Sequence, residues 1–258
     1  MANERNEKET LQAYLKELHL PTFRASFEEV ARQAQQEGLS YERFLLELAQ
    51  REVQERRNGR IARLLRQSQL PQEKSWPALD LKRLPPKVVQ QARLLLEGEF
   101  VDRRENVLAF GSVGSGKTHL LAAIAQELVR SGRKVLVTTC NLLVQELLIA
   151  KRDLKLSRVL KRLAGFGVLV IDDVGYVQQS REEMEVLFTL LAERYERGSV
   201  MLTSNLPFSQ WETIFKDPMT AAAIDRLVHH CVIIELNLPS YRAEQARKAK
   251  KAKDSGEE

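Results

Sequence analysis

An eight-residue run in the middle of the chain constrains the fold more than any other feature. Residues 111–118 read Gly-Ser-Val-Gly-Ser-Gly-Lys-Thr and match the spacing G-x-x-x-x-G-K-[ST]. The apolar residues 107–110 before the run predict a buried strand, and residues 120–129 after it predict a helix. A strand, a glycine-rich turn and a helix in this order predict an α/β unit built on a parallel sheet.

The residue types in this run predict a site for a nucleoside triphosphate such as ATP. Glycines let the backbone curl until its N–H groups point at phosphate oxygens, and the next helix adds the positive end of its dipole. Lys117 is expected to reach the β- and γ-phosphates, and the Thr118 hydroxyl to ligate Mg²⁺. The predicted nucleotide-binding residues are Gly111, Gly114, Ser115, Gly116, Lys117, Thr118 and His119.

Five apolar segments alternate with helical patterns from residue 100 onward. They are rich in Val, Ile and Leu, without the polar alternation of a half-exposed strand, and cover 106–110, 134–139, 167–172, 199–203 and 231–236. Such runs are typical of parallel strands covered on both faces by helices. The sequence therefore predicts a five-stranded parallel sheet in an α/β domain.

Two carboxylates follow the apolar residues of the third predicted strand. Parallel strands deliver the residues at their carboxyl ends to one edge of the sheet, where ligands of open α/β sheets bind. Asp172 is expected to hold Mg²⁺ through its water shell, and Asp173 to act as the base that polarises the attacking water. Because Asp is one methylene shorter than Glu, hydrolysis is expected to be slow.

Two polar residues farther along the chain are further candidates. Asn205, at the tip of the fourth predicted strand, could sense the γ-phosphate and orient water, or simply cap a turn. Arg226 falls on a predicted helix and could act in trans on the γ-phosphate of a neighbouring subunit. It could equally pair with Asp225 or Glu235.

The N-terminal residues 1–70 have almost no strand signal and predict a small helical domain of three or four helices, with Ser40 as a candidate N-cap. Prolines mark a linker over 71–88, where Trp76 either packs on a domain surface or belongs to a stretch that lies across the nucleotide base. The nucleotide-binding domain is expected over 89–244, followed by a disordered basic and acidic tail over 245–258.

Two clusters of basic residues predict a polyanionic partner, in a chain of net charge +5. One lies on the last N-terminal helix, and the other on one face of a helix predicted between the second and third strands. Phosphate-backbone binding to nucleic acid is the functional interpretation, and a solvated basic surface is the alternative. The residues are Arg56, Arg57, Arg60 and Arg63 in the first cluster, and Lys151, Lys155, Arg158 and Arg162 in the second.

No apolar run is long enough to cross a bilayer, and the first residues lack the apolar core of a signal peptide. Cys140 and Cys231 cannot form a disulfide framework and have no metal-ligand spacing. These features predict a protein of a reducing cytosol, without membrane contact.

Taken together, six segments resemble an AAA+ ATPase of the initiator clade, and within it the IstB-like transposition helper ATPases, relatives of the DnaC helicase loaders. The segments cover nearly the whole chain: 110–120, 171–176, 194–199, 202–205, 225–230 and 240–242. The resemblance implies that Asn205 is the sensor-1 residue and Arg226 the arginine finger. It implies that a helix over about 141–163 is the initiator-specific insertion on the DNA-facing side of a spiral assembly. It also implies a domain without a helical lid, with Arg242 as the candidate for a sensor-2 arginine.

Members of this family form ATP-dependent multimers on duplex DNA, deform it and recruit a transposase, so the resemblance implies a homo-oligomeric spiral or ring with this activity. A DnaC-like helicase loader would share the ATPase and differ in its partner. A small-molecule kinase would need an acceptor pocket and lid arginines. A non-hydrolysing DNA scaffold is the fourth alternative, if Asp173 does not support catalysis.

Overall fold

The computed structural model describes residues 2–175, 180–206, 210–211, 218–241 and 243–244 of the 258-residue chain. The chain divides into two compact units, Met1–Arg63 and Leu64–Glu258. Arg242 and the predicted tail over 245–258 lie outside the described residues, as does Tyr176.

The first unit consists of α1 (Ala2–Glu17), α2 (Pro21–Glu37) and the greater part of α3 (Tyr41–Ser68), so the predicted N-terminal helical region is present. Helix α2 begins with Pro21 in its first turn and ends at Gly38, which adopts the left-handed conformation typical of a C-cap. The Ser40 hydroxyl accepts a hydrogen bond from the Arg43 N–H at 3.3 Å, as predicted for an N-cap of α3.

Helix α2 takes its N-terminal cap from α3. Leu20 has no side chain that could cap the helix, and the buried Glu52 carboxylate accepts hydrogen bonds from the N–H groups of Thr22 at 2.9 Å and Phe23 at 3.3 Å. Burial alone would raise the pKa of Glu52, but the hydrogen bonds from Arg56, Thr22 and Phe23 outweigh it and hold this pKa below its usual value.

The second unit contains a five-stranded sheet in which every neighbouring pair of strands is parallel, in the order β2-β3-β4-β1-β5. The strands are β1 (Asn106–Gly111), β2 (Val135–Thr139), β3 (Val168–Val174), β4 (Ser199–Ser204) and β5 (Cys231–Leu236). Each lies within two residues of a predicted strand, so the α/β prediction is confirmed.

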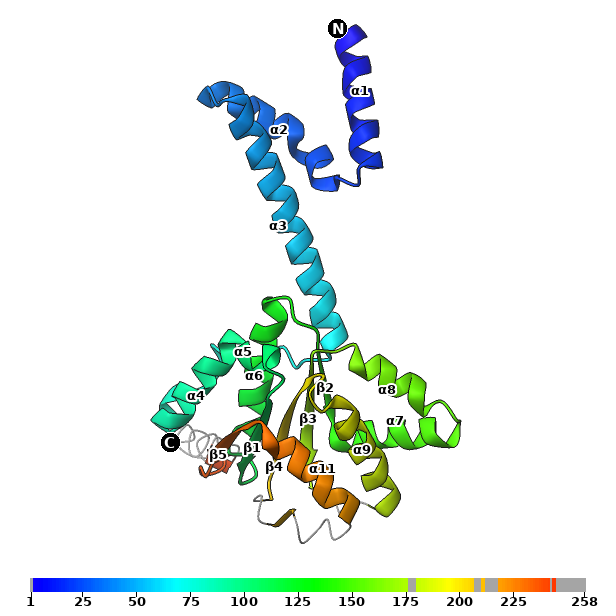
Figure 1. The fold of residues 1–258 in the computed structure, drawn as a ribbon. Coiled ribbons are helices and arrows are strands. Elements are labelled where there is room, and N and C mark those ends of the chain that lie inside the picture. The colour runs from blue at the N-terminus through cyan, green and yellow to red at the C-terminus, as the bar shows by residue number, and fades with distance from the viewer. Residues whose placement is uncertain (1, 176–179, 207–209, 212–217, 242, 245–258) are drawn as a thin grey trace, which may run out of the picture. The chain divides into compact units, whose positions relative to one another are not determined.

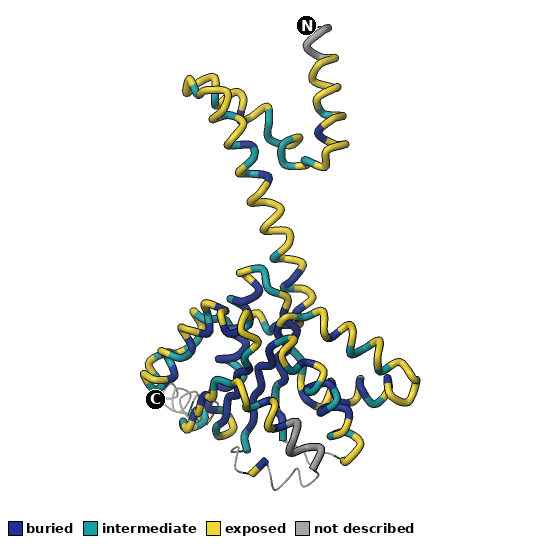
Figure 2. Tube along the Cα trace, in the orientation of Figure 1, coloured by how far each residue is buried: buried dark blue, intermediate teal, exposed yellow. Residues whose placement is uncertain are grey.

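Helices cover both faces of this sheet (Figure 1). One face packs against α4 (Pro86–Glu97), α5 (Glu99–Asp102) and α6 (Lys117–Arg130). The other packs against α7 (Cys140–Arg152), α8 (Leu156–Ala164), α9 (Arg181–Arg194) and α11 (Pro218–His229). The three central strands, β1, β3 and β4, are buried over most of their length between these layers, as Figure 2 shows, whereas the edge strands β2 and β5 are partly exposed. Burial on both faces explains why the sequences of the central strands lack polar alternation.

The prediction of a single helix between the second and third strands is wrong. Two helices, α7 and α8, occupy this region and are separated by a turn at residues 153–155. Lys151 therefore lies at the end of one helix and Arg158 and Arg162 on the next, so the predicted continuous basic face does not exist. The α8 residues Leu156, Leu160 and Leu163 still pack toward the core, as their spacing predicted.

The segment between α3 and α4 packs on the core of the second unit. Leu70 and Leu84 are buried there, and Trp76 is half-buried against the same apolar cluster. A short 3₁₀ helix, η1 (Leu81–Arg83), precedes α4. The predicted domain boundaries at residues 70 and 88 stay predictions. Among the described helices, none combines the length and apolarity that crossing a bilayer requires.

Candidate nucleotide site

The turn between β1 and α6 has room only for glycine at two positions. A Cβ atom on Gly111 would lie 2.2 Å from the Leu236 carbonyl oxygen, and one on Gly114 would lie 2.3 Å from the Ser240 hydroxyl oxygen. Gly114 and Gly116 also have positive φ angles of 79° and 102°. The sequence G-x-x-G-x-G therefore permits a close approach of the chain after β5 to the loop.

Two side chains of this loop point to an anionic ligand. The Lys117 Nζ donates hydrogen bonds to the carbonyl oxygens of Gly111 at 2.7 Å and Ser112 at 2.8 Å, which holds a nearly buried ammonium inside the loop. The Ser115 hydroxyl is buried and has no hydrogen-bond partner among the described residues. Because a buried hydroxyl is normally satisfied, this orphaned group fits a polar ligand in the loop.

A hydroxyl and carboxylate network joins the loop to the ends of β3 and β4. The Asp172 Oδ1 accepts hydrogen bonds from the Thr118 hydroxyl at 2.9 Å and from the Thr203 hydroxyl at 2.5 Å. The Thr203 hydroxyl oxygen also accepts from the Asp173 N–H at 2.9 Å. Asp173 has a φ of 60°, at a shift in the β3–β4 register between Ile171 and Val174. This bulge re-aims the chain at the sheet edge, as bulges next to active sites do.

The loop, Asp172, Asp173 and Asn205 line one cavity of about 500 Å³ at the carboxyl edge of the sheet. Its opposite wall comes from the segment 74–84 and from Leu238 and Tyr241. A cavity of this size, with apolar walls and a few convergent polar groups, is typical of a small-molecule site.

Both parts of this opposite wall, the chain after β5 and the segment 74–84, are hydrogen-bonded to the glycine-rich loop or to the helix that follows it. The Ser112 hydroxyl donates to the Leu238 carbonyl at 2.8 Å, and the Tyr241 N–H donates to the Gly114 carbonyl at 2.9 Å. The His119 Nε2 lies 3.2 Å from the Ser75 carbonyl oxygen, which connects α6 to the segment 74–84. The predicted residues Ser115, Lys117, Thr118 and His119 thus line the same cavity as the carboxylates.

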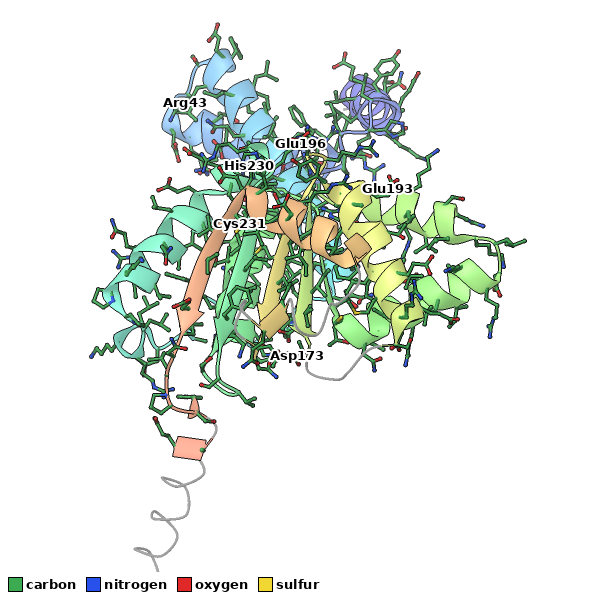
Figure 3. The ribbon with its side chains drawn as sticks, turned by 60° about the horizontal axis from the view of Figure 1, so that its bottom comes forward. Arg43, Asp173, Glu193, Glu196, His230 and Cys231 are labelled. Carbon is green, nitrogen blue, oxygen red and sulfur yellow. The ribbon has the colours of Figure 1, made fainter. Side chains whose placement is uncertain are left out.

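Arg226 is the one predicted catalytic residue that the structure keeps away from this cavity. It is exposed on α11 near Arg104 and His230, where β1 and β5 begin, with its guanidinium 5.9 Å from the centre of the Tyr195 ring. Figure 3 shows the two edges of the sheet: Asp173 lies at one end of the strands, and Glu196, His230 and Cys231 lie at the other.

Two residues that were not predicted from the sequence make several hydrogen bonds near these two edges. Thr203 is one, through its bonds to Asp172 and Asp173. The other is Arg194, whose buried guanidinium donates to the carbonyls of Leu163, Phe166, Gly167 and Ser199 at 3.0–3.2 Å. Burial lowers the pKa of Arg194 to about 10. A Cβ on Gly198 would lie 2.6 Å from this guanidinium, so the motif Arg-Tyr-Glu-Arg-Gly-Ser at 194–199 encodes this packing.

The predicted basic residues are exposed, and several have acidic partners. Arg56 donates to Glu52 and to the His19 carbonyl, which ties it to the fold of the first unit, whereas Arg57, Arg60 and Arg63 extend along the same helix. In the second unit, Lys151 pairs with Glu185 at 2.9 Å and Arg162 with Glu146 at 2.5 Å. Lys155 lies 3.7 Å from Asp153.

Similarity to solved structures supports the fold. The chain is 25% identical to the crystal structure named DnaI, with a TM-score of 0.54, over 66% of this chain and 96% of that one. The DnaC helicase loader is 18% identical, with a TM-score of 0.52, over 65% of this chain and all of that one. Several DnaA replication initiators share the same fold, and the described sheet is thus that of the AAA+ P-loop proteins.

Sequence similarity covers nearly the whole chain. It is 41% identical over 92% of its length to an insertion sequence ATP-binding protein from Sinorhizobium fredii, covering 80% of that protein. It is 36% identical over 95% of its length to a protein from Pseudomonas aeruginosa named as the ATP-binding protein of insertion sequence IS21, covering 91% of it. A family model described as IstB-like ATP binding protein matches residues 13–249. The chain therefore belongs to the IstB-like family of insertion sequence ATP-binding proteins.

Proposed function

We propose that this protein is an ATPase that multimerises on duplex DNA in its ATP-bound form and acts as a transposition helper, preparing target DNA and recruiting a transposase. One observation carries the proposal: the orphaned Ser115 hydroxyl, Lys117, Thr118 and two carboxylates line a single cavity at the carboxyl edge of a parallel sheet. Names of relatives support it, because they associate such chains with insertion sequences.

The loop residues have the chemistry to bind the triphosphate. Backbone N–H groups of 111–118, the Ser115 hydroxyl and the Lys117 ammonium would hold the phosphates, with Lys117 exchanging its present carbonyl partners for phosphate oxygens. Thr118 and Asp172 would hold Mg²⁺, whose role is to neutralise charge on the phosphates. Oxygen ligands of this kind suit a hard cation. Asp173 would take a proton from water, and Asn205 would orient that water.

A second copy of the chain completes the proposed site. Strands of six residues separate the cavity edge from the edge that bears Arg226 by about 20 Å. A guanidinium at that edge is too far from the cavity of its own chain to touch a γ-phosphate there. It is well placed to enter the cavity of a neighbouring copy, where it would stabilise transition-state charge. Assembly and hydrolysis are thereby coupled.

Duplex DNA is the proposed polyanion, contacted by the arginines of α3 and by the basic side chains of α7 and α8. Contacts of this kind act on phosphates and predict strong salt dependence without base recognition. The bacterial cytosol is the proposed compartment.

A helicase loader of the DnaC kind is the second candidate, supported by the likeness to the DnaI and DnaC structures. The transposition role is favoured because the relatives that match over 92–95% of the chain, including the N-terminal unit, are named for insertion sequences.

Duplex binding measured together with particle size, in ATP, in ADP and without nucleotide at two salt concentrations, tests the proposal. Large, salt-sensitive complexes on duplex DNA are expected in ATP, but not in ADP or without nucleotide. Lys117→Ala should abolish them, whereas Lys87→Ala, which removes an exposed lysine of α4, should behave as wild type. Assemblies on DNA that persist in ATP with Lys117→Ala, or a wild-type protein that ignores duplex DNA, would contradict the proposal.

A further inference from the structure

The turn between α7 and α8 exposes a leucine in an unusual backbone conformation. The side chain of Leu154 is 93% exposed, and its φ is 57°, in the left-handed region that favours glycine. The other non-glycine residues described with positive φ are polar or charged: His19, Gln69, Arg104, Asp173 and Glu196. The turn tip, yellow in Figure 2, lies at the periphery of the second unit.

Backbone hydrogen bonds define this turn. The N–H of Asp153 donates to Ile149, that of Leu154 to Lys151 and that of Lys155 to Ala150, at 2.9, 3.1 and 2.7 Å. This is the pattern of a helix C-terminus whose left-handed residue is usually glycine. Leucine at this position costs both backbone strain and exposed apolar area, and the turn gains no packing from it. A strained residue whose side chain gains no packing points to function.

The chain segment around Leu154 is strongly basic, although Lys151 pairs with Glu185 and Arg162 with Glu146. Residues 151–162 contain six Lys or Arg and only Asp153 as an acid. Asp153 lies 3.6 Å from Arg152 and 3.7 Å from Lys155, so one carboxylate is shared between the two cations that flank the leucine. Arg158 is exposed on the first turn of α8. An exposed leucine among cations is a poor surface for an apolar protein partner and a good one for stacked bases flanked by phosphates.

We propose that Leu154 is an apolar wedge that enters the minor groove of duplex DNA and separates two stacked base pairs, while Arg152, Lys155 and Arg158 contact the adjacent phosphates. Inserted aliphatic side chains kink DNA in this way, and the cost of unstacking is offset by the phosphate contacts that the kink allows. The inference rests on the proposed duplex binding and adds to it a residue that deforms the DNA.

Full-length protein, ATP and two dye-labelled duplexes test the wedge, one fully paired and one with a central mismatch that lowers the cost of unstacking. Wild type should shorten the end-to-end distance of the paired duplex and bind the mismatched one about tenfold more tightly. Leu154→Ala should lose both effects and keep the salt dependence of binding. Leu142→Ala, which truncates a leucine on α7 that is 62% exposed, is the matched control and should behave as wild type.

The variant Leu154→Gly distinguishes the cost of the strained backbone from the effect of the leucine side chain on DNA. Glycine relieves the left-handed backbone, so this variant should melt about 3 °C above wild type and still fail to bend DNA. Bending and mismatch preference that survive in Leu154→Ala overturn the wedge while leaving duplex binding intact. A smaller ATP-bound assembly of Leu154→Ala before DNA is added also overturns it, because Leu154 would then contact another copy. A wild-type protein that binds no duplex removes the proposed function and the wedge together.

Discussion

At the scale of single residues, Thr203 connects the Asp172 carboxylate to the backbone of Asp173 in the proposed active site. Its hydroxyl donates to the Asp172 carboxylate and accepts from the Asp173 N–H, and it is fully buried. One side chain therefore fixes both the carboxylate expected to hold Mg²⁺ and the left-handed backbone that aims Asp173. Thr203 is a positioning residue in this account, because it acts through its two neighbours.

Replacing Thr203 by valine keeps the shape and removes the hydroxyl. The ATPase kcat is expected to fall about 10- to 100-fold with little change in KM, because loop contacts to the phosphates remain. The Mg²⁺ concentration needed for half-maximal nucleotide affinity should rise, which is measurable without hydrolysis. Thr203→Ser should restore both quantities. Equal losses of kcat, melting temperature and affinity in the valine and serine variants would indicate a purely structural role.

The position of the glycine-rich turn between β1 and α6 could be predicted from the sequence, because its spacing is a local property of the backbone. Thr203 could not, because its contacts arise from the pairing of β3 with β4 and the bulge at Asp173. Arg194 was missed for the same reason: its four carbonyl partners come from segments up to 31 residues away.

At the scale of elements, the five strands could be predicted because each is a short segment rich in apolar residues without polar alternation, which leaves few alternatives inside an α/β domain. The break between α7 and α8 could not, because the turn carries neither glycine nor proline. The prediction of one basic face assumed that helical spacing continues through Leu154. In the structure, the left-handed backbone of Leu154 ends α7, and α8 runs in a different direction.

Glu52, on α3, caps the N-terminus of α2 in place of a side chain at the N-cap position. This role predicts that the stability of the first unit depends on pH. Its folded pKa lies below the unfolded value of about 4.3, so its contribution to stability is fully present above that value and is lost as the pH falls through the folded pKa. At pH 7, Glu52→Gln should speed hydrogen exchange of the peptide covering the start of α2 about tenfold.

Comparing variant and wild type at each pH cancels the intrinsic pH dependence of exchange. The difference should shrink as the pH falls below the unfolded pKa, and vanish once the wild-type carboxyl is protonated as well. Glu55→Gln, on the exposed side of α3, is the matched control and should leave exchange unchanged at every pH. A Glu52→Gln difference that does not shrink as the pH falls would contradict the capping role.

At the scale of the whole molecule, the order β2-β3-β4-β1-β5 determines what each edge of the sheet presents. The carboxyl edge gathers the loop, Asp172, Asp173 and Asn205, and the opposite edge presents Arg226. The sequence predicted each of these residues. That Arg226 lies on the opposite edge depends on the direction and length of the strands, and on the connection through α11. The separation of the two edges is the physical reason for proposing a site shared between copies.

Subunit mixing tests this central proposal most directly. Asp173→Asn should bind ATP, supply an intact Arg226 to its neighbours and fail to hydrolyse, since asparagine tolerates the left-handed backbone. Arg226→Ala should bind ATP and lack the finger, with hydrolysis on duplex DNA reduced about 1000-fold. We predict that a one-to-one mixture recovers about a quarter of the wild-type rate, from random interfaces that join an intact cavity to an intact arginine. A mixture that hydrolyses ATP no faster than the mean of its two components would contradict a site completed by a second copy.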